Sequence, residues 1–198
     1  MSDALKPVVV VGVGALGSHV AMFARNWKEP LRLIDFDRVE GKNILAQVHS
    51  KLGQGQNKAR ALSQLLAGLW GTSVEAIPHK LSSDNVAPLL GDAALVLDCV
   101  DNIEARLLIQ RFVRAREIPC LHGALSADAR FGRIVWDDAF VPDAEGAQGP
   151  PTCVAGEGLP FFGMMGGWLA GTARAFLDAG ARSSYQLTPT NIVCLGRS

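Results

Sequence analysis

The sequence predicts an α/β protein with a Rossmann-like, doubly wound and mostly parallel sheet that carries helices on both faces. Four consecutive valines, Val8 to Val11, run directly into a glycine-rich turn. Short apolar segments then alternate with longer segments of helical periodicity, which is typical of parallel sheets. Acidic and polar residues follow several of the apolar segments, at the strand ends where doubly wound sheets bind ligands. We therefore expect one domain over residues 1–198.

Composition excludes several classes of function. Lys and Arg number 19, as do Asp and Glu, so the chain lacks the basic excess of a DNA-binding protein. The N-terminal residues lack the apolar core of a signal peptide, and no apolar stretch is long enough to span a membrane. We expect a cytoplasmic protein. The four cysteines form no C-x-x-C pair, so no zinc site is expected, and the histidines have no metal-ligand spacing.

The glycine-rich turn carries the first functional signal. Gly12 permits a tight turn, Gly14 permits close approach of a phosphate to the backbone, and Gly17 permits close packing of helix on strand. Leu16, Val20 and Phe23 then recur at helical spacing, which predicts a helix from Ala15 to about Trp27. The segment predicts a nucleotide site and leaves the choice of nucleotide open.

A second strand at 31–34 ends at Asp35, where a carboxylate is placed to accept ribose hydroxyls. A polar loop follows, and then a helix over 58–69. A lysine at a helix start opposes the helix dipole, so Lys58 is favourable there if it shares an anion with the backbone N–H groups. This loop is longer than an NAD-binding fold needs, which argues against an NAD-dependent oxidoreductase.

Residues 94–102 are expected as a buried strand that ends in two carboxylates, Asp98 and Asp101, and a helix follows over 103–116. Asp101 has two interpretations, as the N-cap of that helix or as a ligand of Mg²⁺, which takes one or two carboxylates beside phosphates. Between the second strand and this one we expect a strand at 74–77 and a helix that Ser83 caps.

The remaining third of the chain completes the sheet. We expect strands at 118–123, 131–136 and 191–195, with an apolar, glycine-broken helix over 159–179 that packs in the core or at a dimer interface. Composition predicts a mobile loop at about 137–157, which contains Cys153. The other thiols, Cys99, Cys120 and Cys194, are expected as small core residues.

Several of these motifs together resemble the ThiF/MoeB/HesA family, the adenylating fold shared with ubiquitin-activating enzymes. The resemblance covers about residues 7 to 180 and rests on five blocks in the family's order: the glycine turn 12–18, the segment 35–40, Asn43 with Gln47, the segment 55–59, and the segment 98–102. Thr152 and Cys153, followed by Gly158, Pro160, Gly163 and Gly166, also resemble the family's crossover loop and the helix after it.

The resemblance implies transfer of AMP from ATP to the C-terminal glycine carboxylate of a ubiquitin-like or sulfur-carrier protein, by a homodimer or heterodimer. Lys58 and Asp101 would act in catalysis, with Asp101 holding Mg²⁺ and Cys153 attacking an acyl-adenylate or forming an acyl disulfide. The implied nucleotide-binding residues are Gly12, Gly14, Gly17, Asp35, Asp37, Asn43, Gln47 and Lys58.

Three departures from the family pattern leave alternatives open. Ala46 stands where the family usually has an arginine before Gln47, and the N-terminal arginine helix and the paired C-x-x-C motifs of many relatives are not seen. One alternative is a non-catalytic or partner-completed subunit that binds nucleotide or a carrier protein. Another is adenylation of a peptide, a small carboxylate or a tRNA base. For Cys153, the alternative is an unreactive loop thiol.

Overall fold

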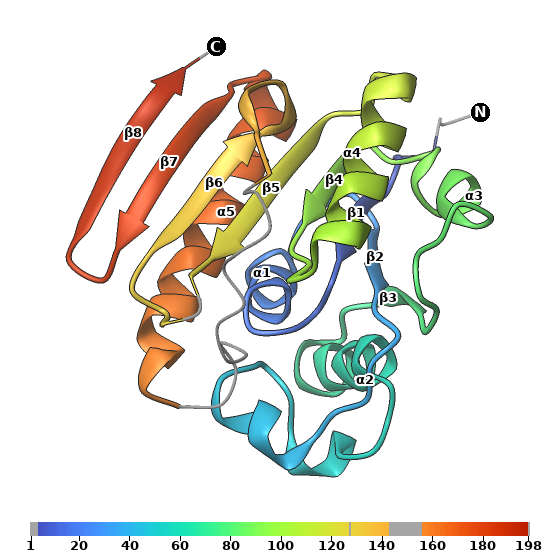
Figure 1. The fold of residues 1–198 in the computed structure, drawn as a ribbon. Helices are drawn as coiled ribbons and strands as arrows, with labels where there is room; N and C mark the ends of the chain where they lie inside the picture. Colours follow the sequence, from blue (N-terminus) through green and yellow to red (C-terminus); the bar gives the residue numbers. More distant parts are fainter. Residues whose placement is uncertain (1–3, 127, 143–155, 198) are drawn as a thin grey trace.

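The computed structural model describes residues 4–126, 128–142 and 156–197. These residues form one sheet of eight strands in the order β3-β2-β1-β4-β5-β6-β7-β8 (Figure 1). The pairs from β3 to β5 are parallel, and the pairs from β5 to β8 are antiparallel. After β3 the chain passes back across the sheet to β4, which pairs in parallel with β1, so the loops after β1 and β4 lie at the same edge. The predicted fold class is confirmed.

The strands have the following bounds: β1 Val8–Val11, β2 Leu31–Ile34, β3 Val74–Ile77, β4 Leu95–Asp98, β5 Cys120–Leu125, β6 Gly132–Trp136, β7 Ser183–Thr188 and β8 Asn191–Arg197. The α-helices are α1 Gly17–Phe23, α2 Lys58–Trp70, α3 Val86–Leu90, α4 Ile103–Arg116 and α5 Leu159–Ala179. Short 3₁₀ turns are η1 Gly41–Leu45, η2 Lys51–Gly53, η3 Asp137–Ala139 and η4 Gly156–Gly158.

Alternate valines of β1 enter two different cores. Val8 and Val10 pack with residues of α1, α2 and α5 on one face of the sheet, whereas Val9 and Val11 pack with residues of α3 and α4 on the other. All four valines are almost completely buried, and each such side chain contributes about 1.5–3 kcal/mol relative to an exposed one. Burial on both faces explains why this strand has no polar alternation.

Helix α5 has the predicted bounds and lies against α1 (Figure 1). A Cβ atom on Gly166 would lie 2.5 Å from the Cβ of His19 and 3.2 Å from the backbone of α1. Gly166 is therefore needed for the two helices to approach, and this part of the helix belongs to the core.

Some local predictions are wrong. Helix α1 ends at Phe23, and the chain then forms turns in which the Trp27 N–H donates to the Ala24 carbonyl. The N-cap position of α3 is Asn85, not Ser83, and no side chain caps the helix there, since the Asn85 Oδ1 accepts from the Ser82 N–H of the preceding turn.

At the C-terminal end of the sheet, strand β7 was not predicted because its polar sequence lacks an apolar run. Cys194 lies on β8, the edge strand, and is exposed, so it is not a core residue. Within the described ranges, no helix has the length and apolarity needed to cross a membrane.

The predicted mobile loop at about 137–157 is described only at its two ends. Its start forms η3 and continues to Phe140, which is buried, and its end forms η4. Residues 143–155, with Cys153, lie outside the described residues.

Candidate functional site

The three glycines of the turn after β1 have different surroundings. Gly12 has a φ of +83°, and a Cβ atom there would lie 2.9 Å from the carbonyl oxygen of Cys99. A Cβ atom on Gly17 would lie 1.8 Å from the Gly12 carbonyl oxygen. Among the described residues, the nearest atom to a Cβ on Gly14 is the Gln47 Nε2 at 3.9 Å, so no described residue closes the space at Gly14. Gly12 and Gly17 are required by the fold, whereas Gly14 leaves room for a ligand to approach the backbone.

Asp35 joins the glycine turn to the end of β2. Its Oδ2 accepts from the Val13 N–H at 2.8 Å, and its Oδ1 accepts from the Asp37 N–H at 2.8 Å. Burial raises the pKa of Asp35, and the positive charge of Lys58 opposes that shift. An ionised carboxylate has about four lone-pair sites, so Asp35 retains acceptor capacity for ribose hydroxyls.

The start of α2 positions Lys58. Asn57 is the N-cap: its Oδ1 accepts from the Arg60 N–H, and its Nδ2 donates to the Asp35 carbonyl at 2.7 Å. This bond ties the helix start to the end of β2. The Lys58 side chain is only 11% exposed, and its Nζ donates to the Asp37 Oδ2 at 3.0 Å. An ammonium group has three donors, so Lys58 can bind an anion while it keeps this ion pair.

The loop between β2 and α2 brings further predicted residues inward. Gln47 is buried, and its Oε1 has no hydrogen-bond partner among the described residues. Asn43 is also buried, and its Oδ1 accepts from the Glu40 N–H in a capping box of η1, while its NH₂ group makes none of the hydrogen bonds found in the described structure. Ala46, between them in the sequence, is completely buried and offers no polar side-chain atom.

Asp101 lies in the loop after β4, where Asn102 accepts from the Ala105 N–H and is the N-cap of α4. The N-cap interpretation of Asp101 is therefore wrong. Asp101 is exposed, and none of the hydrogen bonds or ion pairs found in the described structure involves its side chain. No group of three or more His, Cys, Asp or Glu side chains in these parts of the chain is arranged to hold a metal. A single exposed carboxylate fits a Mg²⁺ ion that takes its other ligands from phosphates and water.

Sequence reasoning missed a buried charged cluster beside this loop. It consists of Asp98, Arg106, His122 and Asp137, and we call it the closed cluster. His122 is completely buried, with Nδ1 2.6 Å from the Asp98 Oδ2 and Nε2 3.0 Å from the Asp137 Oδ1. Burial alone would lower the pKa of His122, but the hydrogen bonds with Asp137 and Asp98 outweigh it and raise the pKa.

The signal for this cluster was present but incomplete. Asp98 ends β4 and His122 lies in β5, and the two are directly paired in the parallel register. The sequence shows that each residue falls within an apolar strand, but it does not give the register that makes them neighbours.

His49 is a second histidine that sequence reasoning left without a role. Its Nε2 lies 3.0 Å from the Val13 carbonyl oxygen, so Nε2–H donates to the glycine turn, and its buried Nδ1 has no partner in the described structure. Burial lowers the pKa of His49 to about 4, with a smaller contribution from the charge of Lys58. His49 is therefore neutral, and its hydrogen bond to Val13 stabilises the glycine turn.

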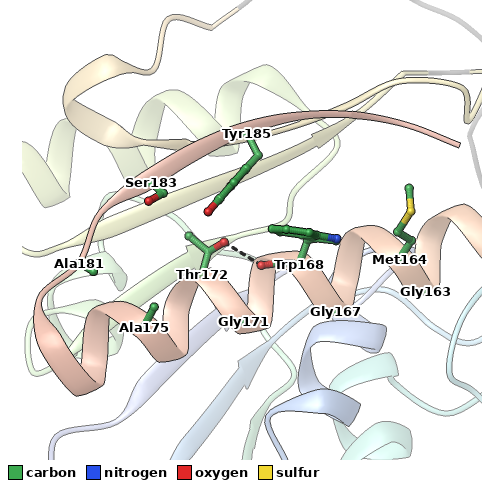
Figure 2. A pocket seen from close by; sticks show the side chains of 10 residues that line it. All are labelled: Gly163, Met164, Gly167, Trp168, Gly171, Thr172, Ala175, Ala181, Ser183 and Tyr185. Carbon is green, nitrogen blue, oxygen red and sulfur yellow. Dashed lines mark hydrogen bonds between the residues drawn. The ribbon is translucent and has the colours of Figure 1, made fainter. Parts of the chain in front are cut away.

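A groove of about 490 Å³ lies between α5 and β7 and is separate from these residues (Figure 2). Trp168 and Tyr185 form its aromatic part, with ring centroids 5.0 Å apart, and Thr172 donates its hydroxyl to the Trp168 carbonyl. None of the predicted site residues lines this groove, and it contains no charged side chain. The candidate site is therefore the edge formed by the loops after β1, β2 and β4.

Solved structures share the Rossmann-like fold of this chain. The crystal structure of Escherichia coli MccB with ATP superposes with a TM-score of 0.75 at 18% identity, over 98% of this chain and 64% of that one. Escherichia coli tRNA N6-threonylcarbamoyladenosine dehydratase has a TM-score of 0.66 at 20% identity, over 89% of this chain and 88% of that one. At these identities the likeness shows the fold alone.

The sequence profile of the ThiF family matches residues 5–178, and the chain belongs to this family. It is 37% identical over 106 residues to the adenylyltransferase and sulfurtransferase MOCS3 of Danio rerio, covering 52% of this chain and 23% of that protein. It is 32% identical over 127 residues to the molybdopterin-synthase adenylyltransferase of Salmonella typhimurium, covering 62% of this chain and 51% of that protein. The chain thus corresponds to between about a quarter and a half of these relatives.

Proposed function

We propose that this chain is an ATP-dependent adenylyltransferase that activates the C-terminal glycine carboxylate of a ubiquitin-like or sulfur-carrier protein. The relatives' names support this substrate class, since they include a sulfur carrier protein ThiS adenylyltransferase from Bacillus subtilis. One observation carries the proposal. The open space before Gly14, the unpartnered Oε1 of buried Gln47 and the partly used donors of Lys58 occur at the same sheet edge.

The residues present fit ATP. Gly14 lets the phosphates approach the backbone, Asp35 has acceptor capacity for the ribose, and Lys58 is a buried cation with donors to spare. Oxygen and nitrogen of a side-chain amide are assigned from their surroundings, so the unpartnered atom of Gln47 is an acceptor or a donor according to the amide orientation. Asn43 adds one NH₂ group. Gly12, Gly17 and Asp37 contribute by shaping the turn and by holding Lys58.

In the proposed reaction, a carboxylate oxygen of the substrate forms a bond to the α-phosphorus of ATP. The bond from the α-phosphorus to the bridging oxygen breaks, and pyrophosphate leaves with the electron pair. The substrate carboxylate is ionised at neutral pH, so no residue has to remove a proton. Lys58 would stabilise the charge that develops on the phosphates, because its ammonium is fixed before the reaction begins.

Asp101 would hold Mg²⁺ at the same phosphates. When bound, the ion would neutralise charge on the phosphate oxygens. Cys153 remains a predicted nucleophile for the acyl group, and assembly as a homodimer or heterodimer remains a prediction.

Exchange of labelled pyrophosphate into ATP tests the proposal. We expect exchange that requires Mg²⁺ and a carrier protein ending in Gly-Gly, and we expect Asp101→Ala to abolish it while the thermal unfolding midpoint is unchanged. Glu104→Ala removes a neighbouring exposed carboxylate and is the matched control, expected to keep the wild-type rate. A wild-type rate for Asp101→Ala would remove Asp101 from the mechanism.

A second candidate, a non-catalytic or partner-completed subunit, is favoured by Ala46. The buried methyl group cannot replace the arginine that the family resemblance implies there, and one such contact is worth about 3 kcal/mol. This candidate predicts that ATP binds in calorimetry while pyrophosphate exchange stays at background with every carrier tested.

A further inference from the structure

The loop that carries Asp101 is held by its preceding residue, Val100. The Val100 N–H donates to the Asp98 Oδ1 at 3.1 Å, and the Val100 carbonyl accepts from the Arg106 Nη2. The same Nη2 also donates to the Gly123 carbonyl on β5 at 3.1 Å. Both backbone polar groups of a single residue are therefore bound by side chains of the closed cluster.

The two side chains that hold Val100 are also fixed to each other. The Arg106 Nε lies 3.5 Å from the Asp98 Oδ2, and that oxygen is also bonded to the His122 ring. Asp98 is completely buried, and the Arg106 side chain is 9% exposed. Within the cluster, two carboxylates are balanced by a guanidinium and an imidazole. A buried charge that lost its partner would be costly, so each member fixes the position of the others.

The outer side of the cluster is closed by α4 and by the segment after β6. Asp137 pairs with the Arg114 Nε at 2.8 Å, and Phe140 stacks on the His122 ring with centroids 4.1 Å apart. Cys120 on β5 lies 3.6 Å from the His122 Nε2, and burial raises the pKa of its thiol. The charged or titratable groups that face His122 are thus Asp98, Asp137, Arg106 and Cys120.

The opposite side of the loop rests on the glycine turn. The Cys99 N–H donates to the Val11 carbonyl at 2.9 Å, and a Cβ atom on Gly12 would lie 3.2 Å from the Val100 nitrogen. The backbone just before Asp101 is therefore held between the turn that would receive the phosphates and the closed cluster.

From this geometry we infer that Arg106, Asp98 and His122 are positioning residues, which fix the Asp101 carboxylate relative to the glycine turn so that the protein binds a divalent cation together with a nucleoside triphosphate. The identity of the ligand rests on the proposed function. The positioning role rests on the hydrogen bonds that Asp98 and Arg106 make with the Val100 backbone, which we call the clamp on Val100. None of the three residues needs to touch the nucleotide. Outer partners of this kind are typically worth about 10- to 100-fold in metal affinity.

Arg106→Lys tests the inference, because lysine keeps the charge but loses the planar group that bonds Val100 and Gly123 together. The matched control is Arg32→Lys. The Arg32 side chain is 12% exposed, and it bonds Glu75 on β3, the Leu89 carbonyl in α3 and Asp92 just after α3. If a loss of stability alone were responsible, the two variants would behave alike.

The first measurement needs no nucleotide. We expect hydrogen exchange at the Val100 amide to be at least about tenfold faster in Arg106→Lys than in wild type, and unchanged in Arg32→Lys. Equal exchange in all three proteins would overturn the clamp.

The second measurement is calorimetric titration with ATP, once with Mg²⁺ and once with EDTA. We expect Arg106→Lys to lose about 10- to 100-fold of the affinity that Mg²⁺ adds, while the affinity for metal-free ATP changes less than about threefold. Equal losses with and without Mg²⁺ would overturn the positioning role. If wild type does not bind ATP, the proposed function and the ligand half of the inference are both wrong, and the exchange result alone decides the clamp.

Discussion

Two polar clusters lie at the carboxyl edge of the same parallel sheet, and they differ in what their side chains leave unused. The open cluster, Asp35, Asp37, Gln47 and Lys58, has spare donors and acceptors next to the unfilled space at Gly14. In the closed cluster, both His122 nitrogens have carboxylate partners, and the buried atom without a hydrogen bond is the Arg106 Nη1. The Arg106 guanidinium lies over the Phe140 ring, 5.3 Å from its centroid.

The difference separates two uses of buried charge. A cluster with unused polar atoms gains free energy when a ligand supplies partners, so its substitution should change binding or rate more than stability. In the closed cluster each charged group is already paired within the cluster, and the Arg106 Nη1 is the exception to its hydrogen bonding, so substitution in this cluster should change stability and backbone position.

His122→Leu should lower the free energy of unfolding by about 3–5 kcal/mol, because it leaves Asp98 buried without its imidazole partner. Urea denaturation followed by circular dichroism measures this. The control is Arg174→Leu, which removes the less buried pair with Glu29 and should cost about 1 kcal/mol or less. A His122→Leu protein as stable as wild type would contradict the structural role assigned to the closed cluster.

Lys58→Ala should lower the rate of pyrophosphate exchange by about 10²- to 10³-fold, because it removes a preorganised cation from the phosphates. Its stability should change by less than about 1 kcal/mol, because the partner, Asp37, is half exposed. Arg60→Ala, two residues along the same helix and exposed, is the control. Equal rate losses in the two variants would mean that the phosphates of ATP do not bind at Lys58.

The nucleotide-free protein should lose stability as the pH falls from about 6.5 to 4, because buried His49 is neutral when folded and takes up a proton when unfolded. The folded pKa of about 4 lies below the unfolded value, so the unfolded state binds more protons in this window. His49 should contribute about 3 kcal/mol to this loss.

Comparison of wild type with His49→Gln in urea titrations at several pH values isolates this contribution, because glutamine can still donate to the Val13 carbonyl but does not titrate. Parallel pH profiles for the two proteins would show that His49 is not held neutral.

Gly17→Ala should destabilise the protein by about 1–3 kcal/mol, because the new Cβ would overlap the Gly12 carbonyl oxygen. Gly14→Ala should change stability by less than about 0.5 kcal/mol, since its Cβ meets only an ordinary contact. ATP titration should nevertheless show weaker binding for Gly14→Ala, because the methyl group enters the space left for the phosphates. Unchanged ATP affinity would remove Gly14 from the site.

The amino-acid sequence was sufficient to predict the fold class, most of the strands and the polar residues at the carboxyl edge of the sheet. Consecutive valines need burial on both faces, the glycines predict a sharp turn, and residues at the ends of parallel strands collect at one edge. These are local or periodic signals, which a single sequence carries. The polar sequence of β7 carries no such signal, and this segment is identified as a strand only by its antiparallel pairing with β6.

Which polar residues are neighbours, and which of their hydrogen-bond donors and acceptors stay unused, became clear only from the tertiary structure. His122 and Asp98 meet because β4 and β5 pair in one particular register, and Asp137 joins them from the segment after β6. Asn102 supplies the cap of α4, so the Asp101 side chain is not used for capping and bonds no other described residue. Strand register and hydrogen-bond satisfaction depend on contacts between distant parts of the chain, and no local pattern encodes them.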